Sequence, residues 1–255
     1  MSGEGATVVS LRGVGKTFDS GTVALDGLNL DVRAGEFVSL LGPSGCGKST
    51  ALRIIADLSA PSKGAVTTPS GGPGSIGFVF QEPTLMPWAD VTANVRLPLK
   101  LAHADEAKAQ AAVAQALVRV GLSDFARAFP RELSGGMKMR ASIARALVTE
   151  PDLLLMDEPF AALDEITRFK LNNDLLALWQ ELRRTVIFVT HSVFESVFLS
   201  QRIVVMTPRP GRVFDEIVID APYPRDEHFR TSAEYGALCR RVSEMLNAAM
   251  AGDGR

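Results

Sequence analysis

Residues 42–50 combine glycines, a lysine and hydroxyl groups at a spacing that could bind phosphate. The stretch reads GPSGCGKST, which fits G-x-x-x-x-G-K-[ST]. Its glycines would let backbone N–H groups surround phosphate oxygens, Lys48 would reach the β and γ phosphates, and Ser49 would bind magnesium. We therefore predict that the loop binds a nucleotide with Mg²⁺ through Gly42, Pro43, Ser44, Gly45, Cys46, Gly47, Lys48, Ser49 and Thr50.

Two acidic residues follow the apolar run Leu153–Met156, which reads LLLM. A buried strand here would deliver both carboxylates at its carboxyl end, where α/β sheets place their ligands. We expect Asp157 to share the magnesium ion with Ser49, and Glu158 to orient or deprotonate an attacking water. Together with the glycine loop, this pair indicates a P-loop NTPase, but it does not choose between families.

A second glycine motif, LSGGM, occupies residues 133–137. A serine followed by two glycines at the start of a helix is another arrangement that binds anions. The chain therefore carries two candidate phosphate sites.

With these three motifs, the chain resembles the nucleotide-binding subunit of an ABC transporter. In that family LSGGQ, or a near variant, binds the γ-phosphate of ATP held by the other subunit of a head-to-tail dimer. The resemblance therefore implies that Ser134, Gly135 and Gly136 contact ATP bound to a second copy of the chain.

Further residues match family elements in their order. Phe18 would stack on the adenine, Gln81 after the strand 76–80 would contact magnesium and the attacking water, and Asp164 would lie in the loop that crosses the dimer interface. His191, after the strand 185–190, would contact the γ-phosphate. The predicted catalytic residues are thus Glu158, His191, Gln81 and Lys48, and the predicted magnesium ligands are Ser49, Gln81 and Asp157.

The likeness covers roughly residues 7–215 and resembles importer subunits for nitrate, sulfonates, taurine and related small organic solutes. Residues 78–99 carry it, as do the stretches DEPFAALDEITR and VVMTPRPGRV. Three positions depart from the family: Met137 replaces the usual Gln, Met139 stands where Gln is frequent, and Asp57 stands where Gly is frequent.

The elements around these motifs alternate between strands and helices, which predicts an α/β fold with a mostly parallel sheet. Residues 7–32 alternate apolar and polar positions and predict an antiparallel β subdomain. Residues 64–74 read as a loop. Residues 82–150 are mainly helical and predict an inserted helical lobe. We expect a single ABC ATPase domain over 1–255, with a core at 7–81 and 151–220 and a tail at 221–255, where 233–250 forms a helix.

Composition and charge limit the classes of partner that the chain can bind. The net charge is -2, from 27 basic and 29 acidic side chains, so no bulk positive field exists to bind nucleic acid. The two cysteines do not form a disulfide framework, and the sequence shows neither a secretory signal nor a membrane-spanning run. The resemblance implies a peripheral protein on the cytoplasmic face of the inner membrane, partnered by transmembrane permease subunits and, through them, by an extracytoplasmic solute-binding protein.

Three alternatives stay open at this point. The first is a soluble ABC-type ATPase that is not coupled to transport, although such proteins usually carry two of these domains or a long coiled coil. The second is a P-loop GTPase or kinase, which would leave LSGGM unexplained. The third is a regulatory subunit that binds ATP without hydrolysing it, and the presence of Glu158 and His191 argues against it.

Overall fold

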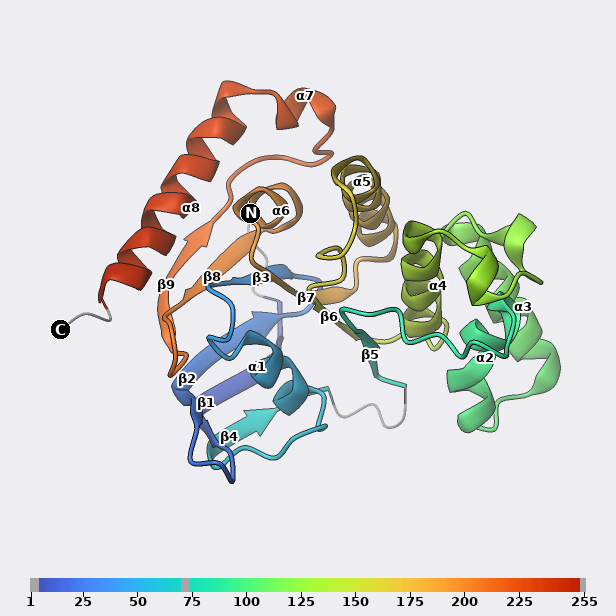
Figure 1. Cartoon of the computed structure of the whole chain (residues 1–255), viewed down its shortest axis with the longest axis horizontal. Coiled ribbons are helices and arrows are strands. Elements are labelled where there is room, and N and C mark those ends of the chain that lie inside the picture. Colours follow the sequence, from blue (N-terminus) through green and yellow to red (C-terminus); the bar gives the residue numbers. More distant parts are fainter. Residues whose placement is uncertain (1–4, 70–73, 253–255) are drawn as a thin grey trace. The chain divides into compact units, whose positions relative to one another are not determined.

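The computed structural model describes residues 5–69 and 74–252. It divides into two compact units (Figure 1), of which the first comprises residues 1–69 and 185–255 and the second residues 70–184. The elements of the first unit are β1 (Thr7–Thr17), β2 (Val23–Arg33), β3 (Phe37–Leu41), α1 (Lys48–Ile55), β4 (Lys63–Thr67), β7 (Thr185–Thr190), α6 (Val193–Leu199), β8 (Arg202–Met206), β9 (Val213–Val218), α7 (Glu227–Arg230) and α8 (Ala233–Ala251).

The predicted antiparallel β subdomain is confirmed as a three-stranded sheet of order β2-β1-β4. Its third strand corrects the prediction of a loop over residues 64–74, because 63–67 form β4 and pair with β1. A glycine makes this strand possible: Gly64 has φ +86°, and a Cβ there would lie 2.5 Å from the carbonyl oxygens of Arg12 and Gly13. The glycine and polar residues of this stretch are typical of turns, so the sequence did not indicate a strand. The rest of the predicted loop includes residues 70–73, which lie outside the described residues.

The parallel core of the first unit is built on β3, which pairs with β7 on one side and with β8 on the other. All five residues of β3 are buried, and so are all six of β7. Strands buried on both faces read as continuous apolar runs, as the sequence predicted. The edge strand β9 pairs antiparallel with β8, and the sequence analysis did not predict it.

The tail beyond residue 220 packs within the first unit. Helix α8 contacts α6, β8 and β9, and Figure 1 shows it running beside them. The helix predicted over 233–250 is confirmed, since α8 begins at Ala233 and ends at Ala251.

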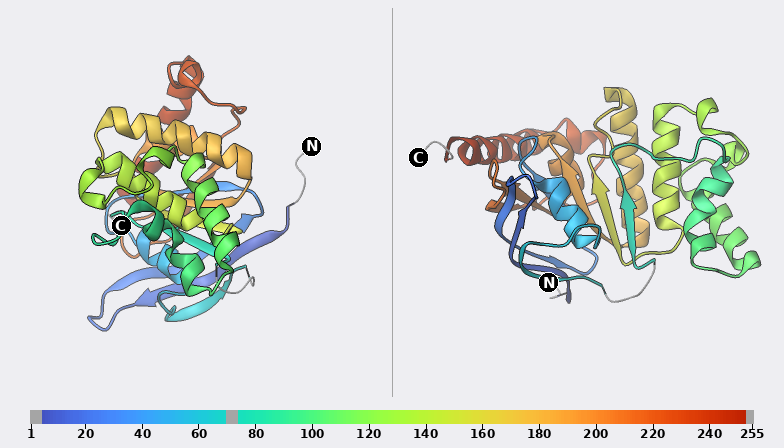
Figure 2. Two further views of the ribbon diagram at one scale, coloured as in Figure 1. Left: turned by 90° about the vertical axis from the view of Figure 1, so that its right-hand side faces the viewer. Right: turned by 60° about the horizontal axis from the view of Figure 1, so that its bottom comes forward.

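The second unit holds a parallel strand pair and a group of helices, which Figure 2 shows from two further sides. Strands β5 and β6 pair in parallel, and α2, α3 and α4 pack on one another. As predicted, residues 82–150 form mainly helix, although α2 had not been delimited. The elements of this unit are β5 (Ile76–Val79), α2 (Val91–Leu101), α3 (Glu106–Arg119), η1 (Ser123–Phe125), η2 (Pro130–Glu132), α4 (Gly135–Leu147), β6 (Leu153–Asp157) and α5 (Glu165–Leu182).

Within residues 5–69 and 74–252 we find no helix that combines the length and the apolar character needed to cross a bilayer.

Candidate functional site

The glycine loop of the first unit joins β3 to α1. Lys48 begins α1 and is only 4% exposed. Its ammonium donates to the carbonyl oxygens of Gly42 (2.8 Å) and Pro43 (3.0 Å). The lysine therefore spans the loop that it belongs to, with its charge at the N-terminus of a helix whose dipole also attracts anions.

Gly47 shows why the loop requires glycine. Its φ is +106°, and a Cβ at this position would lie 2.7 Å from both the carbonyl oxygen of Ala24 and Cδ2 of Leu25. No other residue fits without displacing β2. The glycine in the motif is thus required by a close approach of two backbone segments, in addition to the predicted phosphate binding.

Two residues that the sequence did not reveal contact the backbone of the glycine loop. Arg209 donates to the carbonyl oxygen of Gly45 from Nε (3.2 Å) and from Nη2 (3.1 Å). Gly211 lies so close that a Cβ would stand 2.0 Å from the carbonyl oxygen of Cys46. Both belong to the stretch VVMTPRPGRV, whose turn residues were the available signal, although they did not show where the turn would pack.

Cys46 is buried in the same loop, and burial raises the pKa of its thiol. It is a free cysteine, as is Cys239.

Strand register places His191 beside the glycine loop. In the parallel pair of β3 and β7, Leu41 is the register partner of Thr190. Gly42 and His191 are the next residues along, so both leave the sheet at the same edge. His191 is exposed there.

Phe18 lies in the turn after β1, also in the first unit. Its side chain is 43% exposed, and the Lys16 ammonium lies 5.5 Å from its ring centroid. An exposed aromatic ring is what a stacking platform for adenine needs.

In the second unit, strand register likewise brings Gln81 close to Asp157 and Glu158 in the sheet. In the parallel pair of β5 and β6, Val79 is the register partner of Met156. Gln81 and Glu158 each follow two residues later, and Asp157 ends β6 with 7% of its surface exposed. The three polar side chains therefore come from the carboxyl ends of adjacent strands.

Glu158 occupies a strained backbone conformation, with φ +45°. A residue other than glycine in the left-handed region costs on the order of 1–2 kcal/mol. Its carbonyl oxygen accepts from the N–H of Ala161 at 3.2 Å, so a tight turn imposes the strain. This conformation aims the chain away from the strand directly after Asp157.

The serine and glycines of LSGGM begin α4 as predicted. Ser134 caps the helix and accepts from the N–H of Met137. A Cβ on Gly136 would lie 2.7 Å from Cγ2 of Thr167, and one on Gly135 would lie 3.2 Å from Cδ2 of Leu163. The motif is therefore packed against the segment that contains Asp164.

Asp164 itself has a clear structural task. It caps α5 by accepting from the N–H of Thr167 at 2.9 Å, and that backbone hydrogen bond lowers the pKa of its carboxyl. Its predicted position in the loop across a dimer interface stays a prediction.

Two further residues of the second unit hold the segment after Gln81, and sequence reasoning missed both. Arg145 of α4 donates to the carbonyl oxygens of Pro83 and Thr84, each at 2.8 Å. Asn94 of α2 is fully buried and bonds the backbone of Met86 from both its oxygen and its nitrogen. Sequence periodicity does not reveal such residues, because their side chains hydrogen-bond the backbone of a loop and do not pack in a repeating pattern.

This anchoring leaves Trp88 displayed, with 77% of its surface exposed. The neighbouring Leu85 and Met86 are only partly exposed. An exposed indole on a pinned loop suits a contact with a partner.

The residues present suit ATP and magnesium. Ser49, Gln81 and Asp157 offer a hydroxyl, an amide and a carboxylate oxygen, and oxygen donors are what Mg²⁺ prefers. Among residues 5–69 and 74–252, no cluster of three or more His, Cys, Asp or Glu side chains could hold a different metal.

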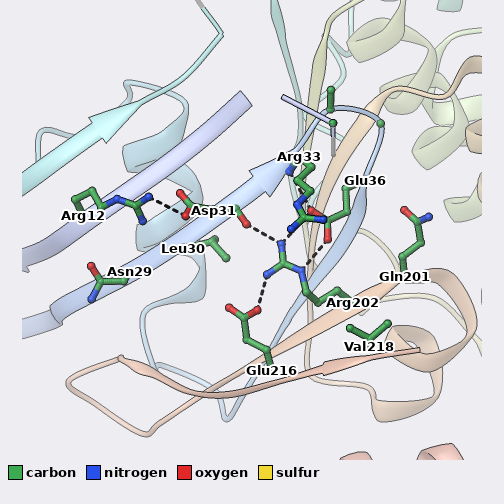
Figure 3. A pocket seen from close by; sticks show the side chains of 13 residues that line it. Arg12, Asn29, Leu30, Asp31, Arg33, Glu36, Gln201, Arg202, Glu216 and Val218 are labelled. Carbon is green, nitrogen blue, oxygen red and sulfur yellow. Dashed lines mark hydrogen bonds and ion pairs between the residues drawn. The ribbon is translucent and has the colours of Figure 1, made fainter. Parts of the chain in front are cut away.

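A hollow of about 810 Å³ on the first unit is not part of this set. Figure 3 shows that its charged side chains bind one another. Arg202 donates to Glu36 from Nε (2.7 Å) and Nη2 (3.0 Å), and to Glu216 at 2.6 Å. Burial lowers the pKa of Arg202, but the hydrogen bonds and charges of the two glutamates outweigh it and leave that pKa above its usual value. Arg202 and the two glutamates that line the hollow are therefore paired with one another, and we interpret the hollow as structural.

The sequence profile of the ABC transporter family matches residues 25–161, just over half of the chain. The chain belongs to the ABC transporter family. It is similar to the taurine import ATP-binding protein TauB of Rhizobium johnstonii, with 47% identity over 77% of each chain. It is similar also to the aliphatic sulfonates import ATP-binding protein SsuB of Bacillus licheniformis, with 42% identity over 92% of each.

Among solved structures, this ABC ATPase is similar to a dimeric ATP-binding cassette in a post-hydrolysis state bound to ADP and Pi. The TM-score is 0.72 at 34% identity, over 84% of this chain and all of the other. The family assignment, the α/β P-loop fold and the ATPase class predicted from the sequence are thereby confirmed.

The departures from the family have local explanations in this ABC ATPase. Met139 is buried, so an apolar side chain replaces a polar one inside the packing of α4. Asp57 follows α1 with φ +58°, a conformation that glycine adopts without strain and aspartate tolerates. For Met137, which replaces the usual Gln and lies partly exposed in the first turn of α4, the structure offers no explanation.

Proposed function

We propose that this ABC ATPase is the ATP-hydrolysing subunit of an importer, which acts as a head-to-tail dimer on transmembrane permease subunits. The observation that carries the proposal is the way α4 begins: the two glycines that open it lie tightly against Leu163 and Thr167, on either side of Asp164. A chain that completed its site alone would not need a second helix start of this kind. The dimeric state of the similar cassette bound to ADP and Pi supports dimerisation.

In the proposed dimer, each ATP lies between the glycine loop of one copy and LSGGM of the other. Backbone N–H groups of residues 42–50 and the Lys48 ammonium hold the β and γ phosphates, and Phe18 stacks on the adenine. Ser134 and Gly136 of the second copy face the γ-phosphate with the positive end of α4. These groups stabilise charge that develops during transfer, which is how this class of reaction is accelerated.

Magnesium would be held by Ser49, Gln81 and Asp157, and would neutralise charge on the phosphates. Glu158 accepts a proton from, or orients, the attacking water, and His191 holds the γ-phosphate in line. Closure of the dimer then moves the permease as a rigid-body change, with the loop that displays Trp88 as its contact. The subunit would work at the cytoplasmic face of the inner membrane, and the permease would receive solute from an extracytoplasmic binding protein.

We infer that the cargo is a small solute of the nitrate, sulfonate or taurine type. The names of TauB and SsuB, for taurine and aliphatic sulfonate import, support the last two, and nitrate rests on the resemblance of the sequence alone. The test is reconstitution of the chain with the permease subunits encoded beside it in proteoliposomes. ATP-dependent uptake of taurine, ethanesulfonate or nitrate is expected. ATP hydrolysis that never depends on a membrane partner would instead favour an ABC ATPase without a transport role.

A further inference from the structure

The tail segment Tyr223–Tyr235 holds the helix that follows His191. Arg225 belongs to this segment and has only 4% of its surface exposed. Among the described residues its guanidinium forms no ion pair with a carboxylate, and burial lowers its pKa. A buried arginine of this kind is costly unless backbone carbonyls accept its protons.

Arg225 donates to carbonyl groups at the end of α6. Nη1 reaches the carbonyl oxygens of Val197 (2.9 Å), Phe198 (3.1 Å) and Ser200 (2.8 Å). The hydroxyl of Tyr223 donates to the carbonyl oxygen of Leu199 at 2.9 Å.

The last four carbonyls of a helix have no partner within it. Here Arg225 and Tyr223 satisfy all four, at residues 197–200. The guanidinium also brings positive charge to the negative end of the helix dipole. Its plane lies over the Tyr223 ring, 4.2 Å from the centroid, so the two side chains act as one clamp.

The same tail segment reaches the other end of α6. The hydroxyl of Tyr235, a buried residue of α8, donates to the carbonyl oxygen of Phe194 at 2.9 Å. Helix α6 is therefore held by the tail near its first and after its last residue.

His191 is tied to α6 through the helix cap. Ser192 caps α6 by accepting from the N–H of Glu195, and its own N–H donates to the Thr190 hydroxyl at 3.0 Å. That hydroxyl donates to the Glu195 carboxylate at 2.6 Å. The residues on both sides of His191 are thus bonded to α6, and a shift of α6 must shift His191.

We propose that Arg225, together with Tyr223, is a positioning residue for His191. It fixes α6 from its carboxyl end, and α6 in turn sets where the imidazole stands at the edge of β7. This inference rests on the proposed catalytic role of His191. It assigns to the tail a part in ATP hydrolysis although the tail touches no reacting atom.

The test compares ATP hydrolysis by the full chain with and without His191. Arg225→Met removes the donors and keeps the stem, whereas Tyr223→Phe removes one hydroxyl and keeps the ring under the guanidinium. We expect kcat to fall about tenfold for Arg225→Met and about twofold for Tyr223→Phe, with KM for ATP unchanged, because a small displacement of a positioned group costs rate rather than binding. Arg225→Lys should recover part of the loss, and Arg240→Ala, an exposed position of α8, should have no effect.

The decisive comparison is the same pair of substitutions in the His191→Ala background. If the clamp acts through His191, neither Arg225→Met nor Tyr223→Phe should lower kcat of the His191→Ala chain by more than about 1.5-fold. The reason is that the effects of residues that act as a unit are not additive. Equal fold losses in both backgrounds, or full activity of Arg225→Met, would overturn the inference. Should Arg225→Met fail to fold, Tyr223→Phe and Arg225→Lys carry the same comparison.

The outcome also separates this inference from the proposed function. If wild-type chain releases no phosphate from ATP, or if His191→Ala hydrolyses ATP as fast as wild type, the site assignment itself is wrong. If His191→Ala is slow and the clamp variants are as fast as wild type, only the role of Arg225 is wrong.

Discussion

Leu41 and Thr190 are register partners in two neighbouring parallel strands. The glycine loop begins one residue after the first, and His191 comes one residue after the second. Two segments separated by about 150 residues of sequence therefore emerge side by side at one sheet edge, where the sheet can present both to a phosphate.

Replacing Glu158 by Gln is expected to leave ATP binding intact and to lower turnover at least about a hundredfold, because the amide cannot accept the proton of the attacking water. The variant should accumulate as an ATP-bound dimer, visible by size-exclusion chromatography with ATP and magnesium. Glu165→Gln, in the first turn of α5, is the matched control. Unchanged hydrolysis in Glu158→Gln would remove the role assigned to this carboxylate.

Replacing Lys48 by Ala should weaken ATP binding at least about tenfold and abolish turnover, because the chain loses the charge that faces the β and γ phosphates. It also removes the two hydrogen bonds that close the loop onto Gly42 and Pro43. Titration with a fluorescent ATP analogue and phosphate release measure the two effects. The exposed Lys170 provides the comparison, and a Lys48→Ala chain that binds and hydrolyses ATP normally would exclude the phosphate-loop assignment.

Replacing Gly47 by Ala should destabilise the chain by about 1–3 kcal/mol and reduce ATP binding. The new methyl group would lie 2.7 Å from the Ala24 carbonyl oxygen, and either the loop or β2 must move. Gly236→Ala in α8 has open space and should stabilise by about 1 kcal/mol. Thermal denaturation with and without ATP tests both, and a Gly47→Ala chain as stable as wild type would contradict the packing described.

The positive φ of Asp57 predicts an unusual order of stability. Asp57→Val should destabilise by about 1–2 kcal/mol, because a β-branched residue is strained in the left-handed region. Asp57→Gly should leave the free energy of unfolding unchanged or raise it slightly, since relief of strain and greater freedom of the unfolded chain oppose each other. Denaturant titration measures the difference, and equal stability of the two variants would count against this backbone conformation.

Replacing Glu36 by Ala should cost about 2 kcal/mol, which corresponds to a fall in Tm of roughly 5 °C. The substitution removes one of the two glutamates that bind Arg202 and leaves only Glu216. The side chains of Arg202 and Glu36 are each 15% exposed. Arg12→Ala breaks a more exposed pair with Asp31 and should cost less than about 1 kcal/mol. ATP turnover per folded molecule should stay the same in both. A loss of turnover in Glu36→Ala at temperatures well below its Tm would show that the hollow has a function beyond structure.

Much of the fold followed from local pattern. The buried strands β3, β6 and β7 are apolar runs that need no tertiary information, because burial on both faces imposes one residue class. The helix α8 was also predicted, over residues 233–250. Strand β4 was missed because Gly64 and its polar neighbours read as a turn, and only the close approach to Gly13 shows why glycine belongs in that strand.

The candidate site divides in the same way. The phosphate loop and LSGGM are short, contiguous segments whose chemistry depends on backbone and residue type, so the sequence contains them in full. Arg145, Arg209 and Arg225 could not be found in this way, since each acts on carbonyl groups far along the chain. An arginine that binds backbone leaves no periodic or charge-pair signal.

By itself, the sequence determined the family to which the chain belongs. It also predicted which groups bind phosphate and the order in which they occur, because these depend on contiguous motifs. Tertiary structure alone decided which strand ends stand together, why Glu158 and Asp57 adopt left-handed backbone, and that the tail closes the carbonyl end of α6. The physical reason is that register, steric approach and hydrogen bonding to distant backbone are set by the packing of whole elements.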